Sequence, residues 1–301
     1  MPTRLDKLVS ERFQLSRRAA QDAVRNGRID LDGVRCDEPG REVELDANVA
    51  FFPNRPKARV VAGRLKILHE DRHVLVVNKP AGLLTVPGPR QEQDSLLDRA
   101  TQYLRVRHGH AHPYLGVIHR LDKDTSGALA LARSAEAVSA FQDLFRAHDI
   151  ERQYLAVVEG RPARDEGTID LPLITDSGNL RRVVARNPGE GRRAITHYRV
   201  IEVFGSVASL VACWLETGRT HQIRIHLAEV GHPVLGEPVY RPRNQPKCKA
   251  RFVRQALHAQ TLGFTHPISG VDVKVEAPLP RDFDSLIVDL RNRYGIRGAG
   301  G

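Results

Sequence analysis

The chain of 301 residues has few cysteines and no long apolar run. Cys36, Cys213 and Cys248 lie far apart and form no CxxC pair, so neither a zinc cluster nor dithiol redox chemistry is predicted. No apolar stretch reaches the roughly 18 residues that a membrane-spanning helix needs. The segment 1–13 lacks the apolar core of a secretory signal, and we therefore expect a cytoplasmic protein.

What the chain has in excess is positive charge. Lys and Arg number 46 against 36 Asp and Glu, which gives a formal net charge of +10. The expected partner is a polyanion, and nucleic acid is favoured over a membrane surface because no basic amphipathic helix stands out. With 41% hydrophobic and 27% charged residues, the composition is that of a folded globular protein, and the length suggests about two domains.

Residues 1–54 predict a small unit of helices followed by a hairpin. Ser16 stands where an N-cap belongs, ahead of a helix over 17–26 that Gly27 closes. The pair Asp32-Gly33 is typical of the type I′ turn between two short strands. In this order of elements, RLDKLVSERF and SRRAAQDAVRNGRIDLDGVR resemble an S4-type RNA-binding domain, a small α/β unit.

Charge is divided unevenly within this unit. Residues 1–28 hold seven basic and three acidic side chains, a net +4, whereas residues 29–54 hold two and seven, a net −5. Arg17, Arg18, Arg25 and Arg28 cluster on and just after one helix, and two interpretations of them are open, a phosphate-facing surface or a solvated helix face. The S4-type resemblance implies RNA binding, which makes Arg17 and Arg18 substrate-binding candidates.

The rest of the chain predicts an α+β domain with a mixed, mainly antiparallel sheet. Strand-like and helix-like stretches alternate over 67–295 without the regular repeat of a parallel sheet. Ser134 is expected to cap one helix and Thr220 another. Residues 55–66, rich in proline and basic side chains, are expected to form a linker, and the glycine-rich end, 296–301, a flexible tail.

The segment GVIHRLDKDTSG at 116–127 concentrates polar chemistry in a short stretch. A carboxylate flanked by basic residues stays ionised, so Asp122 is a candidate nucleophile or base in sugar chemistry. On spacing alone, the commoner explanation is a structural Asp that caps a turn and pairs with Arg120. The residues by themselves leave both explanations open.

Within that segment, HRLDKDTSG resembles the signature of the RluA-type pseudouridine synthases. Four further segments resemble the family in the family's order: NKPAGLLTVPG at 78–88, RQYLAVVEG at 152–160, LETGRTHQIRIHLAEVGHPVLGEPVY at 215–240 and RQALHAQTLGFTHP at 254–267. The family isomerises uridine in RNA by detaching the base at N1 and rejoining it to the ribose through C5. The resemblance therefore implies a pseudouridine synthase fold and an RNA-modifying isomerase.

The resemblance also implies roles for single residues. Asp122 is the catalytic carboxylate, which attacks or deprotonates the ribose side of the nucleotide. Tyr154 lies against the base and is the candidate to take the C5 proton. Arg224 holds Asp122 and keeps it charged, and Arg120 enters the base stack when the uridine is flipped out. Further substrate-binding candidates are His119, Lys79 and Arg219.

No cofactor and no metal are expected, because isomerisation transfers neither electrons nor phosphoryl groups. The alternating histidines of HGHAH at 108–112 suggest a metal site, but Gly109 and Pro113 favour a loop, and no nearby Cys or carboxylate completes the ligand set. Two basic stretches, 177–199 and 241–255, are expected to contact RNA phosphates, with solvated loops as the alternative.

Several functions remain to be compared. A non-catalytic RNA-binding or ribosome-assembly factor is disfavoured by the intact Asp122, Tyr154 and Arg224, and a nucleoside-cleaving enzyme would release free uracil. Large-subunit ribosomal RNA is the first expected substrate and tRNA the second, for a protein expected to be a monomer. Where the family usually has GDxxYG, this chain has GEPVYR at 236–241, which leaves the local loop geometry open.

Overall fold

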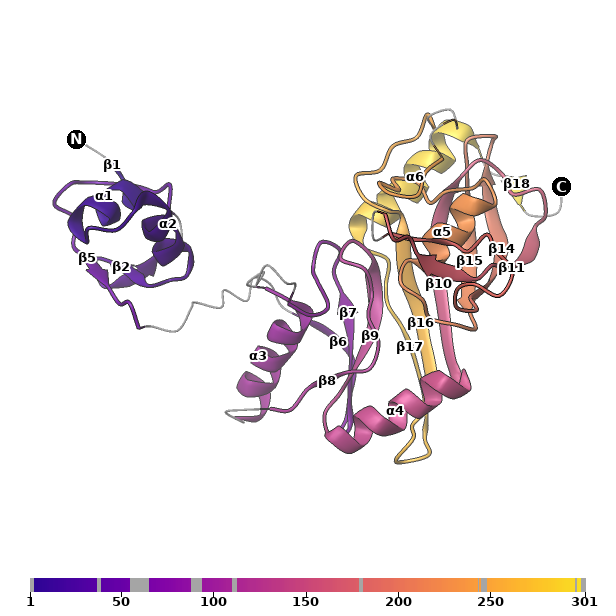
Figure 1. Ribbon diagram of the computed structural model, residues 1–301, viewed down its shortest axis with the longest axis horizontal. Helices are drawn as coiled ribbons and strands as arrows, with labels where there is room; N and C mark the ends of the chain where they lie inside the picture. Colours follow the sequence, from indigo (N-terminus) through magenta and orange to yellow (C-terminus); the bar gives the residue numbers. More distant parts are fainter. Residues whose placement is uncertain are drawn as a thin grey trace. The chain divides into compact units, whose positions relative to one another are not determined.

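The chain forms two compact units, residues 1–62 and 63–301, in a computed structural model (Figure 1). The structure describes residues 3–36, 39–54, 65–87, 94–109, 113–178, 181–242, 244, 248–295 and 297–298. Each unit has its own buried apolar cluster, so each is described by itself.

The first unit packs a helix pair on short strands. Its elements are β1 (Thr3–Arg4), α1 (Leu5–Arg12), α2 (Arg17–Arg25), β2 (Ile29–Leu31), β3 (Val34–Cys36), β4 (Glu42–Val43) and β5 (Val49–Phe51). Strand β2 is the middle of a sheet with the order β3-β2-β5. Apolar side chains from both helices and from this sheet, including Leu5, Val24 and Ile29, are fully buried between them.

Two local predictions for this unit are confirmed. The Ser16 hydroxyl accepts a hydrogen bond from the backbone N–H of Ala19 and so caps α2. Asp32 and Gly33 have φ values of 52° and 79°, the left-handed pair that a type I′ turn requires. Short-range chemistry therefore fixes both features.

The second unit is built on one large mixed sheet, as predicted. Its main path is β11-β14-β15-β10-β16-β9-β7-β6, with β17 beside β16, β18 beside β14 and β8 beside β9. Neighbours run antiparallel except for the parallel pair β16 and β9. The strands are β6 (Lys66–Glu70), β7 (Val74–Lys79), β8 (Gly116–Val117), β9 (Ser126–Ala132), β10 (Ile150–Glu159), β11 (Glu166–Asp170), β14 (Ile195–Phe204), β15 (Ala208–Leu215), β16 (Leu257–Thr265), β17 (Asp272–Glu276) and β18 (Arg297–Gly298), while β12 (Leu173–Thr175) and β13 (Arg182–Val184) form a separate hairpin.

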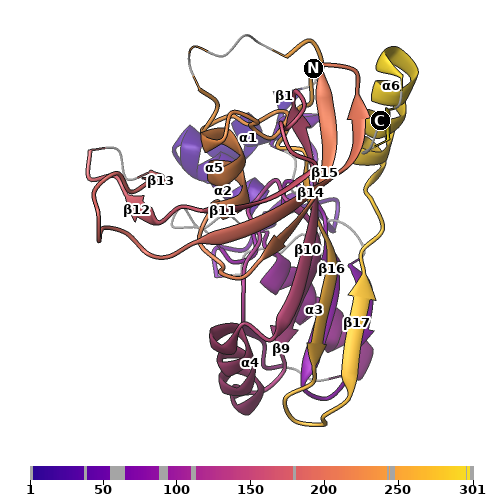
Figure 2. The same ribbon diagram turned by 90° about the vertical axis from the view of Figure 1, so that its right-hand side faces the viewer.

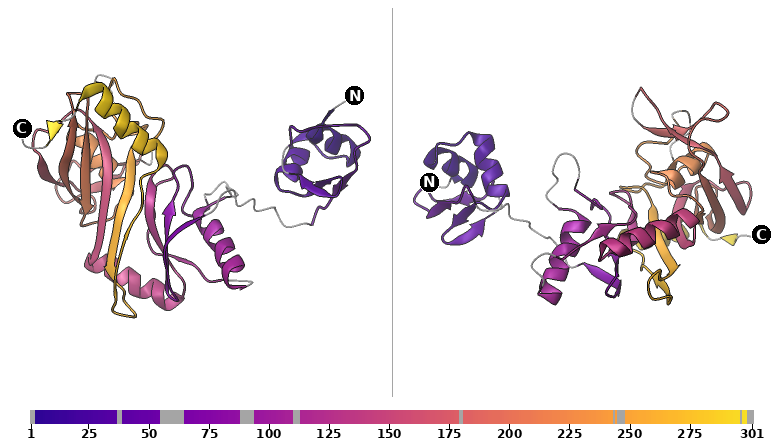
Figure 3. Two further views of the ribbon diagram at one scale, coloured as in Figure 1. Left: turned by 180° about the vertical axis from the view of Figure 1, so that it is seen from behind. Right: turned by 60° about the horizontal axis from the view of Figure 1, so that its bottom comes forward.

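Helices flank this sheet. They are α3 (Leu96–His108), α4 (Ala135–Ala147), α5 (Gln222–Glu229) and α6 (Arg281–Tyr294). Figures 2 and 3 show α5 and α6 on opposite faces of the sheet, and Figures 1 and 2 both place α4 beside the ends of β9 and β10. Among the described residues, no helix is both long and apolar enough to cross a membrane.

The predicted caps in this unit fare differently. Ser134 accepts from the N–H of Ala137, so the cap of α4 is confirmed. The cap at Thr220 is wrong: α5 begins at Gln222, after His221 in a left-handed conformation with φ 59° and no side-chain cap. The reason is local competition, because the amide oxygen of Gln222 takes the N–H of Arg219 and tightens the turn ahead of the helix.

The end of the chain also differs from its prediction. Within the expected tail at 296–301, Arg297–Gly298 form β18 and pair antiparallel with Glu202 and Val203 of β14. β11 pairs only with residues 195–199 on this side of β14, so the backbone groups farther along the strand are available for this pairing. The other residues of that tail lie outside the described residues.

Candidate active site

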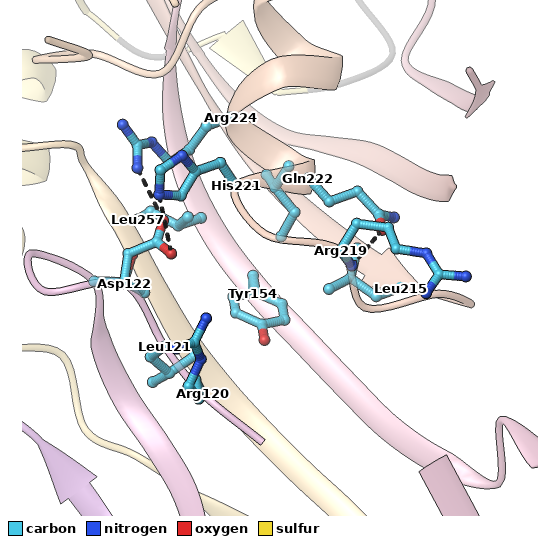
Figure 4. A pocket seen from close by; sticks show the side chains of 12 residues that line it. Arg120, Leu121, Asp122, Tyr154, Leu215, Arg219, His221, Gln222, Arg224 and Leu257 are labelled. Atoms are coloured by element: carbon cyan, nitrogen blue, oxygen red, sulfur yellow. Dashed lines mark hydrogen bonds and ion pairs between the residues drawn. The ribbon is translucent and has the colours of Figure 1, made fainter. Parts of the chain in front are cut away.

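A cleft of about 1000 Å³ opens in the second unit, over β10 and beside the start of α5. A smaller pocket of about 60 Å³ is lined by Asp122, Tyr154 and Arg224, together with Arg120 and Arg219, and these five residues also line the cleft. Figure 4 shows their side chains gathered from the loop before β9, from β10, from the turn before α5 and from α5 itself. The fold thus joins segments about 30 to 100 residues apart in the sequence.

The carboxylate of Asp122 is held by Arg224 and has His221 nearby. Nη1 of Arg224 donates to Oδ2 at 2.9 Å, and Nε2 of His221 lies 3.6 Å from Oδ1 (Figure 4). The Asp122 side chain remains 22% exposed toward the cleft. The ion pair with Arg224 therefore orients the carboxylate and leaves part of it accessible to a ligand.

Arg224 is itself clamped by a second carboxylate, that of Glu237. Nε and Nη2 of Arg224 donate to the two oxygens of Glu237 at 2.7 Å each, and both side chains are buried. Burial alone would lower the pKa of Arg224, but the hydrogen bonds and charges of Glu237 and Asp122 raise it. The guanidinium therefore stays charged between two acids.

Glu237 was not among the residues singled out from the sequence. There the segment GEPVYR raised only a question of loop geometry, and the structure answers it: one Glu237 oxygen also accepts the N–H groups of Val239 and Tyr240. Arg241 forms an ion pair with Glu159 at 3.0 Å. The signal that could have identified Glu237 from the sequence was its position as an acidic residue inside a family-like segment.

His221 was missed in the same way, although it lies within the THQIR segment. Its Nδ1 is 2.6 Å from the Tyr240 hydroxyl, and its Nε2 faces Asp122. Burial lowers the pKa of His221, an effect that the charge of Asp122 partly offsets, so a neutral imidazole is favoured near neutral pH. One ring thus connects the carboxylate with the tyrosine hydroxyl.

The loop that carries Asp122 has little regular secondary structure and is held by side chains from elsewhere. Three of its backbone carbonyl groups accept hydrogen bonds from side chains distant in the sequence. The bonds run from Thr85 Oγ1 to Leu121, from Lys79 Nζ to Lys123 and from Arg254 Nη1 to Asp124. Side chains from distant parts of the sequence therefore fix the backbone on both sides of Asp122.

Lys79, predicted to bind substrate, is fully buried. Its Nζ donates to the carbonyls of Pro80, Leu83 and Lys123. Burial lowers the pKa of Lys79 to about 7. Because all three donors of the ammonium are used inside the protein, none is left for a substrate, and we assign Lys79 to holding the loop instead.

Tyr154 projects into the pocket from β10. Strand β10 lies between β15 and β16 in the sheet, and its pairing with β16 has an irregularity between Gln153 and Tyr154. Figure 4 shows the ring between Asp122 on one side and Arg219 on the other. Burial raises the pKa of Tyr154, so the resting side chain is a neutral phenol.

The remaining candidates in this unit lie around the cleft. His119 lines it, its Nε2 accepts the N–H of Ala130 at 3.0 Å, and its ring centroid is 5.1 Å from that of Phe145. Burial, helped by the charge of Arg152, lowers the pKa of His119 to about 3, which keeps the ring neutral. Arg120 and Arg219 are exposed at the cleft, as a contact with RNA requires.

Arg17 and Arg18 belong to the other unit. Both are exposed on α2, and Nε of Arg17 lies 4.0 Å from the buried carboxylate of Asp6. They form part of a basic helix surface but not of the cleft lining.

The histidine-rich segment does not form a described metal site. His108 is the last residue of α3, and Gly109 closes that helix with φ 69°. His110 and His112 lie outside the described residues. Within the part of the chain that the structure describes, no group of three or more His, Cys, Asp or Glu side chains is placed to hold a metal ion.

Of the two basic stretches, the first includes β13 and the start of β14. Arg186, Arg193 and Arg199 are well exposed there and pair with Glu229, Glu216 and Glu166. The second stretch includes the exposed Lys249 and Arg251. Exposed ion pairs of this kind are weak and easily exchanged, so these arginines can turn to a polyanion.

Family models match parts of both units, and related proteins match most of the chain. The model of the RNA pseudouridylate synthase family matches residues 73–229, and that of the S4 domain matches residues 3–49. "Ribosomal large subunit pseudouridine synthase D" of Zymomonas mobilis is 41% identical, covering 96% of this chain and 95% of that protein. The protein of the same name from Xanthomonas campestris is 37% identical, with 96% and 89% covered. The solved structure of human RNA Pseudouridylate Synthase Domain Containing 4 is 28% identical, with a TM-score of 0.63 over 77% of this chain and 94% of that one.

Proposed function

The chain belongs to the RNA pseudouridylate synthase family, and from this premise we propose that its substrate is large-subunit ribosomal RNA. Isomerisation of uridine in RNA is the activity of the family and of this chain. The proposal for the substrate is supported by relatives that are similar over 96% of this chain, S4 domain included, and that are named as large-subunit synthases. tRNA is the second candidate.

The chemistry rests on one observation: Asp122 faces the cleft while Arg224 holds its far oxygen. A flipped uridine that enters the cleft presents C1′ to this carboxylate. The N1–C1′ bond breaks, the base turns, a C5–C1′ bond forms, the C5 proton leaves and N1 gains a proton, so the product is an isomer. Asp122 acts either as the nucleophile at C1′ or as the base that removes a ribose proton.

Tyr154 is proposed to receive the C5 proton, whose loss restores the conjugation of the uracil ring. Since Tyr154 rests as a neutral phenol, its oxygen accepts this proton only as its own proton is passed on. Arg120, exposed at the cleft, is proposed to fill the gap in the RNA stack with its planar guanidinium. Both roles need a cleft that admits a nucleotide, and about 1000 Å³ is sufficient.

The other candidates are assigned to binding. Arg219 and the neutral His119 are proposed to contact the RNA at the cleft, and Arg17 and Arg18 to contact phosphates from the S4-type unit, residues 1–54. Residues 67–295 are proposed as the catalytic domain, with 55–66 as the linker. We further propose that the protein acts as a monomer in the cytoplasm, without a cofactor.

The test is pseudouridine mapping of ribosomal RNA and tRNA from cells that lack the protein. We expect at least one site in large-subunit ribosomal RNA to lose its pseudouridine. Wild type restores it, Asp122→Asn does not, and Asp165→Asn, the same change at an exposed residue, does. A deletion strain that keeps every site overturns the substrate proposal, restoration by Asp122→Asn overturns the role of Asp122, and release of free uracil overturns isomerisation.

A further inference from the structure

A second arginine of the cleft is buried without an acidic partner. Arg152 lines the cleft from β10, two positions before Tyr154, and is only 7% exposed. Among the described residues, no carboxylate lies within ion-pair distance of its guanidinium, whereas the buried Arg224 pairs with two carboxylates and the buried Arg254 with one. Arg152 is therefore a candidate for an anion that the protein does not supply.

The contacts of Arg152 use only part of its donor set. Nη2 donates to the carbonyls of Leu215 and Glu216 at 3.1 and 3.2 Å, while Nε is buried and has no hydrogen-bond partner. These two bonds fix the guanidinium at the end of β15. They neutralise none of its charge, because carbonyl oxygens are dipoles and not anions.

The surroundings of Arg152 hold the guanidinium in place without cancelling its charge. Its Cζ lies 5.3 Å from the ring centroid of Phe145 on α4, and that ring in turn packs against His119. His119 is neutral, as shown above, so it neither repels nor balances the arginine. Burying a guanidinium without a counter-charge is unfavourable, and such burial persists where a ligand completes the site.

We propose that Arg152 forms a phosphate subsite of the cleft, which binds one backbone phosphate of the RNA next to the flipped uridine. This subsite rests on the proposed function, because it assigns part of the same cleft to the same RNA. Two positions along a strand span about 7 Å, so a nucleotide whose base lies at Tyr154 brings its neighbouring phosphate to Arg152. A planar guanidinium is suited to phosphate, since its donors match two oxygens at once.

The test compares a charged and an uncharged RNA backbone. The probes are pentauridylate and the same pentamer with all linkages replaced by neutral methylphosphonates. Dissociation constants are measured for the full chain as wild type, Arg152→Gln and Arg152→Lys. The matched control is Arg293→Gln, because Arg293 is exposed, is paired with Asp289 and does not line the cleft.

We expect Arg152→Gln to weaken binding of pentauridylate about tenfold and to leave binding of the neutral pentamer unchanged. Arg152→Lys keeps a cation and should recover part of the loss, which also shows that the variant fold can bind RNA. Arg293→Gln should stay within about twofold of wild type on both probes.

Two outcomes would overturn the subsite. Wild-type affinity of Arg152→Gln for pentauridylate means that no phosphate is bound there. An equal loss on both probes means that Arg152 contacts the base or only supports the fold. The binding assay needs no turnover, so it tests the subsite independently of the substrate. If the deletion strain keeps every ribosomal site modified but Arg152→Gln still weakens binding of pentauridylate alone, the proposed substrate is refuted and the subsite is kept.

Discussion

Arg224 on α5 donates to Asp122 at 2.9 Å through Nη1, while its other two nitrogens, Nε and Nη2, donate to Glu237. The arginine is therefore held rigidly by a buried acid that no RNA can reach, and it presents a fixed positive edge to the acid that faces the cleft. Two carboxylates thus have different tasks: Glu237 orients Arg224, and Asp122 faces the cleft where the reaction is proposed to occur. Glu237 is a positioning residue in this arrangement, because it acts on Asp122 through Arg224.

Glu237→Gln tests this positioning role. The neutral amide cannot accept both bonds from Arg224, so we expect the free energy of unfolding to fall by about 3 kcal/mol, as for other broken buried ion pairs. The turnover number should fall as well, because Arg224 is free to turn away from Asp122. Glu237→Asp, one methylene shorter, keeps the charge and should lose less of both.

Chemical denaturation and single-turnover kinetics measure these two effects. Glu276→Gln, at an exposed residue of β17 outside the cleft lining, serves as the control. A Glu237→Gln protein with wild-type turnover would show that Arg224 needs no second acid.

Tyr154→Phe separates packing from proton transfer. The change keeps the buried ring on β10 and removes only the hydroxyl, so RNA affinity should remain within about twofold of wild type. If the hydroxyl oxygen takes the C5 proton, turnover should fall by about 10²-fold or more, the usual loss for a general acid or base. Release of tritium from RNA labelled at uridine C5 follows this step directly. Tyr103→Phe, which loses a hydrogen bond to Glu70 away from the cleft, should retain activity. Retained tritium release by Tyr154→Phe would exclude the proposed role.

His119 predicts a pH dependence of stability. Its folded pKa is about 3, lowered from an ordinary value of 6.5 by burial and by Arg152. Between these two values the unfolded chain binds a proton that the folded chain does not, so the free energy of unfolding falls as pH falls, by up to about 1.4 kcal/mol per pH unit. The stability advantage of wild type over His119→Gln should therefore shrink from pH 6.5 to pH 4.5 in urea unfolding. A constant difference over this range would mean that the His119 pKa is not lowered by folding.

Salt should weaken RNA binding steeply. The +10 chain presents arginines at the cleft, along the β12-β13 hairpin and on α2, and each phosphate that they neutralise releases counterions. For a single strand, the logarithm of the binding constant falls with the logarithm of salt concentration with a slope of about −0.7 per neutralised phosphate. Affinity for an unmodified large-subunit RNA transcript, measured between low and moderate salt, gives this slope. A flat response would show that the basic stretches do not contact the backbone.

Local features of this protein could be predicted from short stretches of sequence. The Ser16 and Ser134 caps and the Asp32-Gly33 turn follow from chemistry within four residues, and the structure confirms all three. The predicted cap at Thr220 was wrong because the same short stretch also contains Gln222, whose side chain binds the backbone N–H of Arg219 in the turn before α5. Residue propensities do not tell which of two such side chains forms the hydrogen bond. The residues proposed for catalysis were found because they lie in contiguous family-like segments.

The sequence by itself determined which residue types are present for chemistry, the excess of positive charge, and a mixed sheet with an S4-type unit, since these depend on composition and on patterns within a segment. Only the tertiary structure decided which of these side chains meet. Three arrangements depend on distances between segments far apart in the chain. They are the ion pair of Glu237 with Arg224, the hydrogen bonds of Lys79 to the loop of Asp122, and the burial of Arg152 without an acidic partner. Burial and pairing are properties of three-dimensional packing, and no spacing along the chain encodes them directly.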